Sequence, residues 1–452
     1  MFPYSSASNF LPDPSCNSFA INSIDMPSSR NFVRPKIHLH SGSLSLPAFS
    51  ETTPMESSSV VSVSITPEHL YEQSHPKPPL LFHHQIARFQ AQSGQIMTRS
   101  DFRCDNFAEK GNKVSHSLER QVCQMTEVID FHIHFTPEEL VRPHLKPDGK
   151  IDVLMQNGLP AYTYHDTLFR FERHIECMDT AGIDVAVLSS GAGMGGSQDA
   201  CELINATANR IQKQHPNRFT PLAHIDPASD RWRTELKRCG EEYGFRGVAF
   251  PSSFGTYSLD SEILTPVYEA LEEADMFVFI HPALSVPEGI SRYYDKYDLY
   301  RCVGREHELV LATYRLIAGG VFDKFPELEV VMSHLGGGIG AIISRIRGYQ
   351  DKAHMGLPPD SPHSITALKS FDHYISKNLF FDTGGLFGSI KAIHAAITEL
   401  PASRLVFGTD YPQEIRDADT MAKFVKDIQE SDLPIEVING ILGDNGAHLV
   451  GH

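Results

Sequence analysis

The sequence lacks the features that would mark a nucleic-acid-binding, membrane-spanning or disulfide-stabilised protein. Lys and Arg total 39 against 56 Asp and Glu, which leaves a net charge of −17, whereas phosphate backbones are bound by clustered cations. The seven cysteines are scattered without any Cys-x-x-Cys pair, so neither a disulfide framework nor a cysteine zinc site is indicated. The longest apolar runs, such as Phe277–Ile280, are far shorter than the roughly 20 residues of a membrane helix.

These absences predict a cytoplasmic protein with neither nucleic acid nor a membrane as its partner. The N-terminus also has no basic segment followed by an apolar one, so no secretory signal is predicted. The acidity does not exclude an anionic small molecule as substrate, because a few local arginines and a metal ion can outweigh a distant net charge.

Residues 1–124 differ in composition from the rest of the chain. They are rich in serine and interrupted by prolines such as Pro76, Pro78 and Pro79, and they have no long periodic apolar stretch that could offset chain entropy. One short segment, Leu80–Gln90, could form a helical turn or two. We expect a disordered extension rather than a targeting or regulatory tail, with Met125 as the natural start of a folded domain over residues 125–452.

From Val128 onward, short β-rich runs alternate with helical stretches, which is typical of a parallel sheet with covering helices. Leu264, Val267, Leu271 and Ala274 recur at helical spacing, as in a helix that covers such a sheet. A doubly wound open sheet is the alternative, but no Gly-x-Gly-x-x-Gly follows the first strand. The fold class expected is a (β/α)8 TIM barrel with eight strands, over Val128–Phe135, Asp184–Ser189, Thr220–Ile225, Gly247–Pro251, Phe277–Pro282, Glu329–His334, Leu379–Asp382 and Leu405–Asp410.

Polar residues stand at the ends of several of these strands, where a TIM barrel carries its catalytic groups. Strand one ends with His132 and His134, strand five with His281, strand six with His334 and strand eight with Asp410. His132 and His134 are two residues apart, so they face the same side of their strand. Imidazoles with one carboxylate suit Zn²⁺, and also Mn²⁺, so this combination predicts a metal site.

The same residues carry a family resemblance. The segments VIDFHIHF, VFIHP, VVMSHLGGGIGAIISRIR and LVFGTDYP resemble the amidohydrolase-related branch of the metal-dependent amidohydrolase superfamily. The chain resembles in particular the aminocarboxymuconate-semialdehyde decarboxylase type, which includes several aromatic-acid decarboxylases. This resemblance covers nearly all of residues 128–450.

The resemblance implies that His132, His134, His281 and Asp410 hold one divalent metal ion, with Zn²⁺ favoured and Mn²⁺ possible. It also implies that His334 is a general acid or base. Binuclear relatives have a carboxylated lysine at the end of strand four, but this chain has Gly247–Pro251 there, without a lysine. We therefore expect a single metal ion.

Two reactions remain open for such a site. One is decarboxylation of a small aromatic or unsaturated carboxylic acid, in which His334 supplies the proton that replaces CO₂. The other is hydrolysis of a lactone, ester or amide, in which Asp410 or His334 handles the proton. A non-catalytic barrel is a third reading, which the complete set of ligands disfavours.

A carboxylate substrate also needs a cationic partner, and arginine binds carboxylates best. Arg345, eleven residues after His334, matches an arginine that in family decarboxylases reaches the active site of a neighbouring subunit, which implies a homodimer; otherwise it is a surface residue. Tyr162 stands where the semialdehyde decarboxylase has a substrate-binding arginine, a departure that puts that substrate in doubt, although Arg170 or Arg173 could substitute.

The tyrosine-rich insert after strand five, residues 290–301, is typical of a lid or specificity loop. Its Arg292 and Arg301 are further candidates for contact with a substrate carboxylate. The alternative is that both are ordinary surface charges. Three glycines, Gly336, Gly337 and Gly338, would let the chain approach the site closely after His334.

Overall fold

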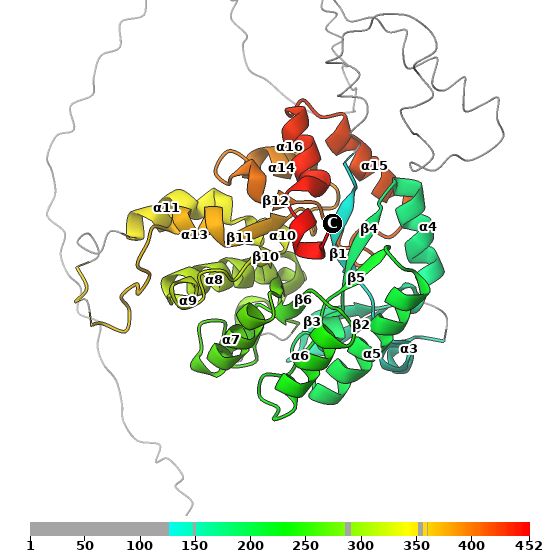
Figure 1. The fold of residues 1–452 in the computed structure, drawn as a ribbon, viewed down its shortest axis with the longest axis horizontal. Helices are drawn as coiled ribbons and strands as arrows, with labels where there is room; N and C mark the ends of the chain where they lie inside the picture. The colour runs from blue at the N-terminus through cyan, green and yellow to red at the C-terminus, as the bar shows by residue number, and fades with distance from the viewer. Residues whose placement is uncertain (1–125, 148–150, 285–290, 351–355, 359) are drawn as a thin grey trace, which may run out of the picture. The chain divides into compact units, whose positions relative to one another are not determined.

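The computed structural model describes residues 126–452 apart from 148–150, 285–290, 351–355 and 359 (Figure 1). These residues lie within one compact unit. The extension predicted over 1–124, with its short helix at Leu80–Gln90, lies outside the described residues.

Eight parallel strands form the centre of the domain. They make two sheets, ordered β1-β4-β5 and β12-β11-β10-β9-β6. Backbone hydrogen bonds join the two sheets at both seams: Phe131 donates to the Phe407 carbonyl and Ala249 to the Ala223 carbonyl. The strands therefore close into the predicted barrel, and their bounds are Ile129–His134 (β1), Val185–Ser189 (β4), Phe219–Pro221 (β5), Gly247–Pro251 (β6), Phe277–His281 (β9), Val330–Met332 (β10), Leu379–Asp382 (β11) and Leu405–Val406 (β12).

Each predicted strand is present, but three are shorter than expected: β5 ends at Pro221 instead of Ile225, β10 ends at Met332 instead of His334, and β12 is the shortest. β12 ends at Val406 instead of Asp410. Beyond this point the Thr383 hydroxyl takes over the pairing, since it accepts a hydrogen bond from the Gly408 amide at 3.0 Å and donates to the Gly408 carbonyl at 3.1 Å. A side chain thus replaces the backbone hydrogen bonds between β11 and β12 where the chain leaves the barrel toward Asp410.

Helices surround the barrel, and α4 lies beside α15 where the ring closes. The predicted covering helix is α7, in which Val267 and Leu271 are buried. Ala274 does not continue this face, because the helix ends at Glu273 and Ala274 is exposed. The longer helices are Phe171–Ala181 (α4), Gln198–Gln214 (α5), Trp232–Glu241 (α6), Thr265–Glu273 (α7), Arg305–Ala318 (α8), Ile343–Tyr349 (α11), Phe371–Lys377 (α13), Ile390–Ala396 (α14) and Ala418–Gln429 (α15).

Two layers of apolar side chains stabilise this arrangement. The inner cluster fills the barrel with residues such as Phe131, Phe279 and Val331, and Leu449 and Val450 from the C-terminal segment pack against it. A larger outer cluster lies between strands and helices. The interior is therefore a packed core, so that ligand binding is confined to the strand ends.

The sequence reading missed a β-hairpin between β1 and α4. Its strands are Asp152–Gln156 (β2) and Leu159–Tyr164 (β3), paired antiparallel. Asn157 and Gly158 connect them with φ of 49° and 79°, the positive values that a tight two-residue hairpin turn requires. The Asn157-Gly158 pair was the feature of the sequence from which this hairpin could have been predicted. A second short pair, Ser253–Phe254 (β7) with Tyr257–Ser258 (β8), follows β6.

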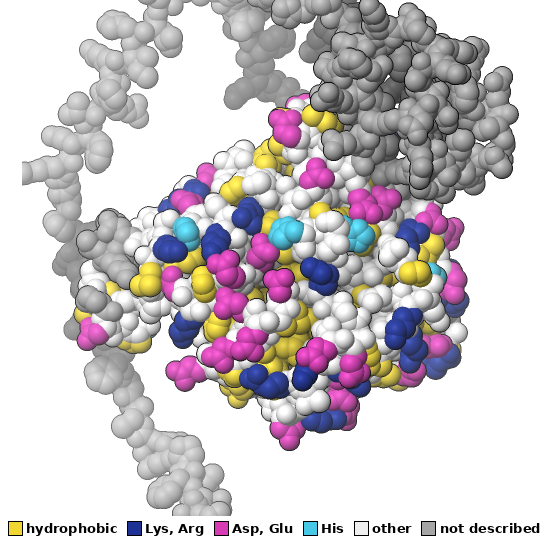
Figure 2. All heavy atoms as spheres, viewed as in Figure 1, with side chains coloured by type: hydrophobic (Ala, Val, Ile, Leu, Met, Phe, Trp, Pro, Cys, Tyr) yellow, Lys and Arg dark blue, Asp and Glu magenta, His cyan; other side chains and the backbone are white. Residues whose placement is uncertain are grey.

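Acidic and basic side chains are interspersed on the face seen in Figure 2. The ion pairs of the described residues include those of Arg347 with Asp372 at 2.9 Å and with Glu399 at 2.6 Å. Four cysteines fall in the described part of the chain (Cys177, Cys201, Cys239 and Cys302), and all four are free. No helix among the described residues combines the length and the apolar character needed to cross a membrane.

Candidate metal centre

A bulge in β1 directs its two histidines into the site. The pairing of β1 with β4 shifts between Asp130 and Ile133, and the His132 amide donates to the Asp130 carboxylate at 2.9 Å instead of to the neighbouring strand. The same carboxylate accepts the Thr409 hydroxyl at 2.6 Å, so it joins strand one to the segment before Asp410. As expected from their spacing, His132 and His134 face the same space, and both are fully buried.

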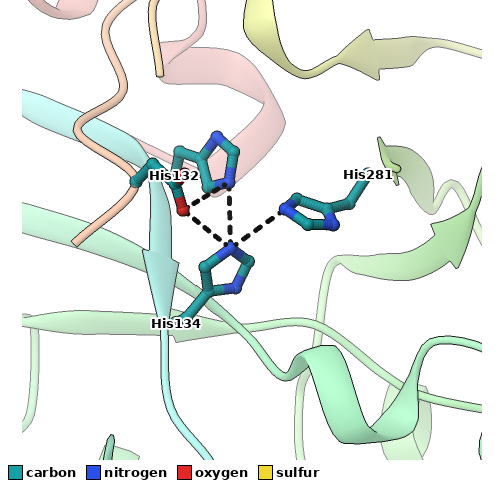
Figure 3. Close-up of side chains that lie close together, drawn as sticks. His132, His134 and His281 are labelled. Atoms are coloured by element: carbon teal, nitrogen blue, oxygen red, sulfur yellow. Dashed lines mark hydrogen bonds and ion pairs between the residues drawn. The ribbon is translucent and has the colours of Figure 1, made fainter. Parts of the chain in front are cut away.

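The four predicted ligands come together at the carboxyl ends of the strands. The Nε2 atom of His134 lies 3.0 Å from Nε2 of His132, 3.2 Å from Nε2 of His281 and 3.1 Å from Oδ1 of Asp410. The three imidazoles point toward one another in Figure 3, and all four donor atoms lie within 4.8 Å of one another. Donor atoms that all bind the same metal ion, each at about 2.0–2.2 Å from it, lie this close to one another.

Each histidine offers its Nε2 atom to the site while its Nδ1 atom faces another group. Nδ1 of His134 lies 3.0 Å from the Ser189 hydroxyl, and Nδ1 of His281 lies 3.1 Å from the Pro282 carbonyl. Nδ1 of His132 lies 3.0 Å from Asp382, within ion-pair distance although not aligned for a hydrogen bond. Such outer partners are what metal-bound histidines require, so these residues fit one metal site.

Electrostatics favour the protonation states that bind metal. Burial lowers the pKa of His134 and, still more, that of His281, which keeps both rings neutral. Burial raises the pKa of Asp410, but His132 and His134 outweigh it and lower that pKa to about 2. Burial also lowers the pKa of His132, yet Asp382 and Asp410 raise it above its ordinary value. A divalent cation would take the place of the proton that these two carboxylates attract to His132.

Backbone strain marks two of the site residues. His334 has φ of 54° and Asp410 has φ of 53°, values that cost about 1–3 kcal/mol in residues other than glycine. Gly336, Gly337 and Gly338 continue the left-handed turn with φ of 63° to 74°. A Cβ on Gly337 would lie 2.0 Å from the Glu306 carbonyl, so this glycine allows the close approach that the sequence predicted.

That approach brings Glu306, at the start of α8, to His334. The Glu306 carboxylate lies 2.9 Å from Nδ1 of His334, while Nε2 of His334 lies 3.9 Å from Asp410. Burial lowers the pKa of His334, but Glu306, Asp410 and Asp382 together raise it to about 10. The three carboxylates therefore favour the protonated form of the His334 imidazole beside the metal ligands.

The predicted substrate-binding residues lie in different surroundings. Tyr162, on β3, is buried, and its hydroxyl lies near Thr136 and Gln413. Arg301 forms an ion pair with Asp298 and donates to Thr163 of the hairpin at 3.2 Å. Arg292 is exposed, with its guanidinium 4.8 Å from the ring of Tyr293.

Arg345 is also exposed and lies 4.8 Å from the ring of Tyr349 on its own helix. In this single chain it does not contact the metal ligands, so the predicted homodimer and the role of Arg345 in it stay predictions. The two alternatives to Tyr162 are exposed as well: Arg170 pairs with Asp166 at 2.7 Å, and Arg173 lies on α4.

Sequence reasoning missed four polar residues around the site. Asp382 ends β11, and its position at a strand end was a usable signal. Glu306 and Arg305 open α8, where Glu306 contacts His334, 28 residues later, and Arg305 contacts Ala161, 144 residues earlier. Glu414 lies close to Asp410, and burial together with the Asp410 charge raises its pKa to about 7.

Comparison with known proteins places this geometry in a family. A model of the amidohydrolase family matches residues 129–451. The chain is 28% identical over 265 residues to gamma-resorcylate decarboxylase of Rhizobium sp. strain MTP-10005, which covers 54% of this chain and 77% of that protein. It is 27% identical over 345 residues to 2-amino-3-carboxymuconate-6-semialdehyde decarboxylase of Dictyostelium discoideum, which covers 72% of this chain and 91% of that protein.

The fold is shared with solved structures. One is 5-carboxyvanillate decarboxylase of Novosphingobium aromaticivorans complexed with manganese and 4-hydroxy-3-methoxy-5-nitrobenzoic acid, with a TM-score of 0.61 and 20% identity over 73% of this chain and 97% of that one. The family model spans more than half of the chain and includes all four metal ligands, which confirms the resemblance read from the motifs. The chain therefore belongs to the amidohydrolase family, as a metal-dependent enzyme of that family.

Proposed function

We propose that this enzyme is a mononuclear decarboxylase, a carbon–carbon lyase that removes CO₂ from a small aromatic or unsaturated carboxylic acid. The observation that carries the proposal is His334, with its Nδ1 atom 2.9 Å from the Glu306 carboxylate, beside a complete set of three histidines and one aspartate. Decarboxylation needs an acid at this place, because a proton must replace the departing carboxyl group. The similarity to two proteins named as decarboxylases supports the same reaction.

A single divalent ion would be held by His132, His134, His281 and Asp410. When bound, it supplies a Lewis acid that orients substrate oxygens and stabilises negative charge. These donors suit both Zn²⁺ and Mn²⁺, and the manganese in the solved 5-carboxyvanillate decarboxylase supports Mn²⁺. The β6 strand offers only Gly247–Pro251 at the position of a bridging lysine, which supports one ion per chain.

The protein residues would carry the proton transfer. The bond between the ring carbon and the carboxyl carbon breaks, CO₂ leaves, and the electron pair stays on the ring carbon. His334 then donates the proton on Nε2 to that carbon, and the imidazole of His334 regains a proton from solvent. Glu306 accepts the hydrogen bond from Nδ1, so that Nε2 faces the substrate throughout.

The proposal is tested with the full chain loaded with Mn²⁺ or Zn²⁺ and a panel of hydroxybenzoates, unsaturated diacids and lactones. We expect about one metal ion per chain, largely lost in His132→Ala, and CO₂ release from at least one acid. His334→Asn should retain the metal but lose CO₂ release by about 100-fold or more. Lactone opening without CO₂ release from any acid would replace the proposal with a hydrolase, the second reaction that these ligands could serve.

A further inference from the structure

Arg305, the first residue of α8, has a guanidinium without an acidic partner. Its Nη2 group donates to the Ala161 carbonyl of β3. Its Nε atom is buried without a hydrogen-bond partner, and no carboxylate of the described residues lies within ion-pair distance of it. Arg305 as a whole is only partly buried.

This guanidinium lies beside the metal centre. Arg305 directly precedes Glu306, whose carboxylate lies 2.9 Å from Nδ1 of His334. Its Nη2 group reaches the β3 hairpin, where the Thr163 carbonyl accepts a hydrogen bond at 3.2 Å from Gln413, three residues after Asp410. Tyr162, whose hydroxyl lies near Thr136 and Gln413, follows directly after the Ala161 that Arg305 contacts. A guanidinium without a counter-ion and a tyrosine hydroxyl thus lie on the same part of the β3 hairpin.

The arginines singled out from the sequence do not provide such a cation within this chain. Arg301 is neutralised by Asp298, and Arg292 and Arg345 are exposed against tyrosine rings. A buried charge without a counter-ion is costly, so a bound anion would stabilise it. An anion with two oxygens in one plane matches the fork of N–H groups on arginine.

We propose that Arg305 binds the carboxylate of the acid substrate and thereby determines that the enzyme selects acids over the corresponding neutral phenols. This assignment rests on the proposed function, since it takes the substrate to be a small carboxylic acid. Tyr162 would donate its hydroxyl to a further oxygen of the same molecule. Arg305 is a specificity-determining residue in this scheme, distinct from His334, which supplies the proton.

The test measures binding by calorimetry to the metal-loaded full chain. The probes are 2,6-dihydroxybenzoate and resorcinol, which share a ring and two hydroxyls and differ only in the carboxyl group. Arg305→Met should weaken binding of the acid tenfold or more and change binding of the phenol less than twofold, with Arg305→Lys between wild type and Arg305→Met. Arg315→Met on the same helix is the matched control, because Arg315 is exposed and pairs with Asp260.

Three results would overturn the assignment. These are equal acid affinity in Arg305→Met and wild type, equal loss of acid and phenol, and wild type that does not bind the acid. Thermal unfolding separates a structural role: Arg305→Met should melt at or above the wild-type temperature without ligand, because it removes a buried unpaired charge. Retained selectivity for the acid in a wild type that releases no CO₂ would refute the decarboxylase proposal and leave the role of Arg305 intact.

Discussion

The Asp382→Asn variant tests how the metal centre is held together. Asp382 Oδ2 lies 3.0 Å from Nδ1 of His132, and both side chains are fully buried. Its other oxygen accepts the His334 amide at 3.0 Å and the Gly384 amide at 2.8 Å. An asparagine can keep these two backbone bonds only by turning its amide oxygen toward them, which places its NH₂ group against His132.

That orientation sets a donor against the Nδ1–H group of His132. The favoured tautomer of the ring would then carry its proton on Nε2, the atom that should bind the metal. Loss of such an outer partner typically weakens metal binding about 10–100-fold, which is about 1.4–2.7 kcal/mol. The fold should persist, because both backbone hydrogen bonds remain and no volume is lost.

The assay is a competition titration of Mn²⁺ or Zn²⁺ against a chelator, with circular dichroism to confirm folding. Asp372→Asn is the matched control, since Asp372 is an exposed aspartate on α13 paired with Arg347, and it should bind metal like the wild type. A folded Asp382→Asn protein with wild-type metal affinity would refute the argument that Asp382 sets the tautomer of His132.

Two further predictions concern proton positions. In Glu306→Gln, kcat should fall about tenfold or more with little change in KM. The alkaline limb of the pH profile of kcat should also move to lower pH, because the ion pair that helps to raise the pKa of His334 to about 10 is lost. A pH profile equal to that of the control variant Glu308→Gln would contradict this prediction. Burial lowers the pKa of His224 to about 3, so below the unfolded pKa of about 6.5 only the unfolded chain gains this proton. Between pH 8 and pH 4.5 the free energy of unfolding of the wild type should therefore fall by about 2.5 kcal/mol more than that of His224→Asn. Urea denaturation at both pH values measures this difference, and equal losses of stability in the two proteins would refute the prediction.

The sequence by itself determined the barrel and a metal site at the strand ends, for a physical reason that is local, while the choice of the four ligands among the polar residues there came from the family resemblance. Alternation along β1 places His132 and His134 on one face whatever surrounds them, and the carboxyl ends of parallel strands meet at one edge. The positions of His281, His334 and Asp410 followed from counting strands. The Asn157-Gly158 turn was equally local, and the hairpin could have been predicted from it.

Only the tertiary structure decided which charged groups meet the ligands. Glu306 reaches His334 because Gly337 lets the turn after β10 approach α8. Arg305 reaches the site because β3, more than 140 residues earlier in the chain, lies against the start of the same helix. Both contacts join segments far apart in sequence, and helical periodicity along α8 contains no information on them. The tertiary structure likewise separated Arg305, which lacks a carboxylate partner among the described residues, from Arg301, which Asp298 neutralises.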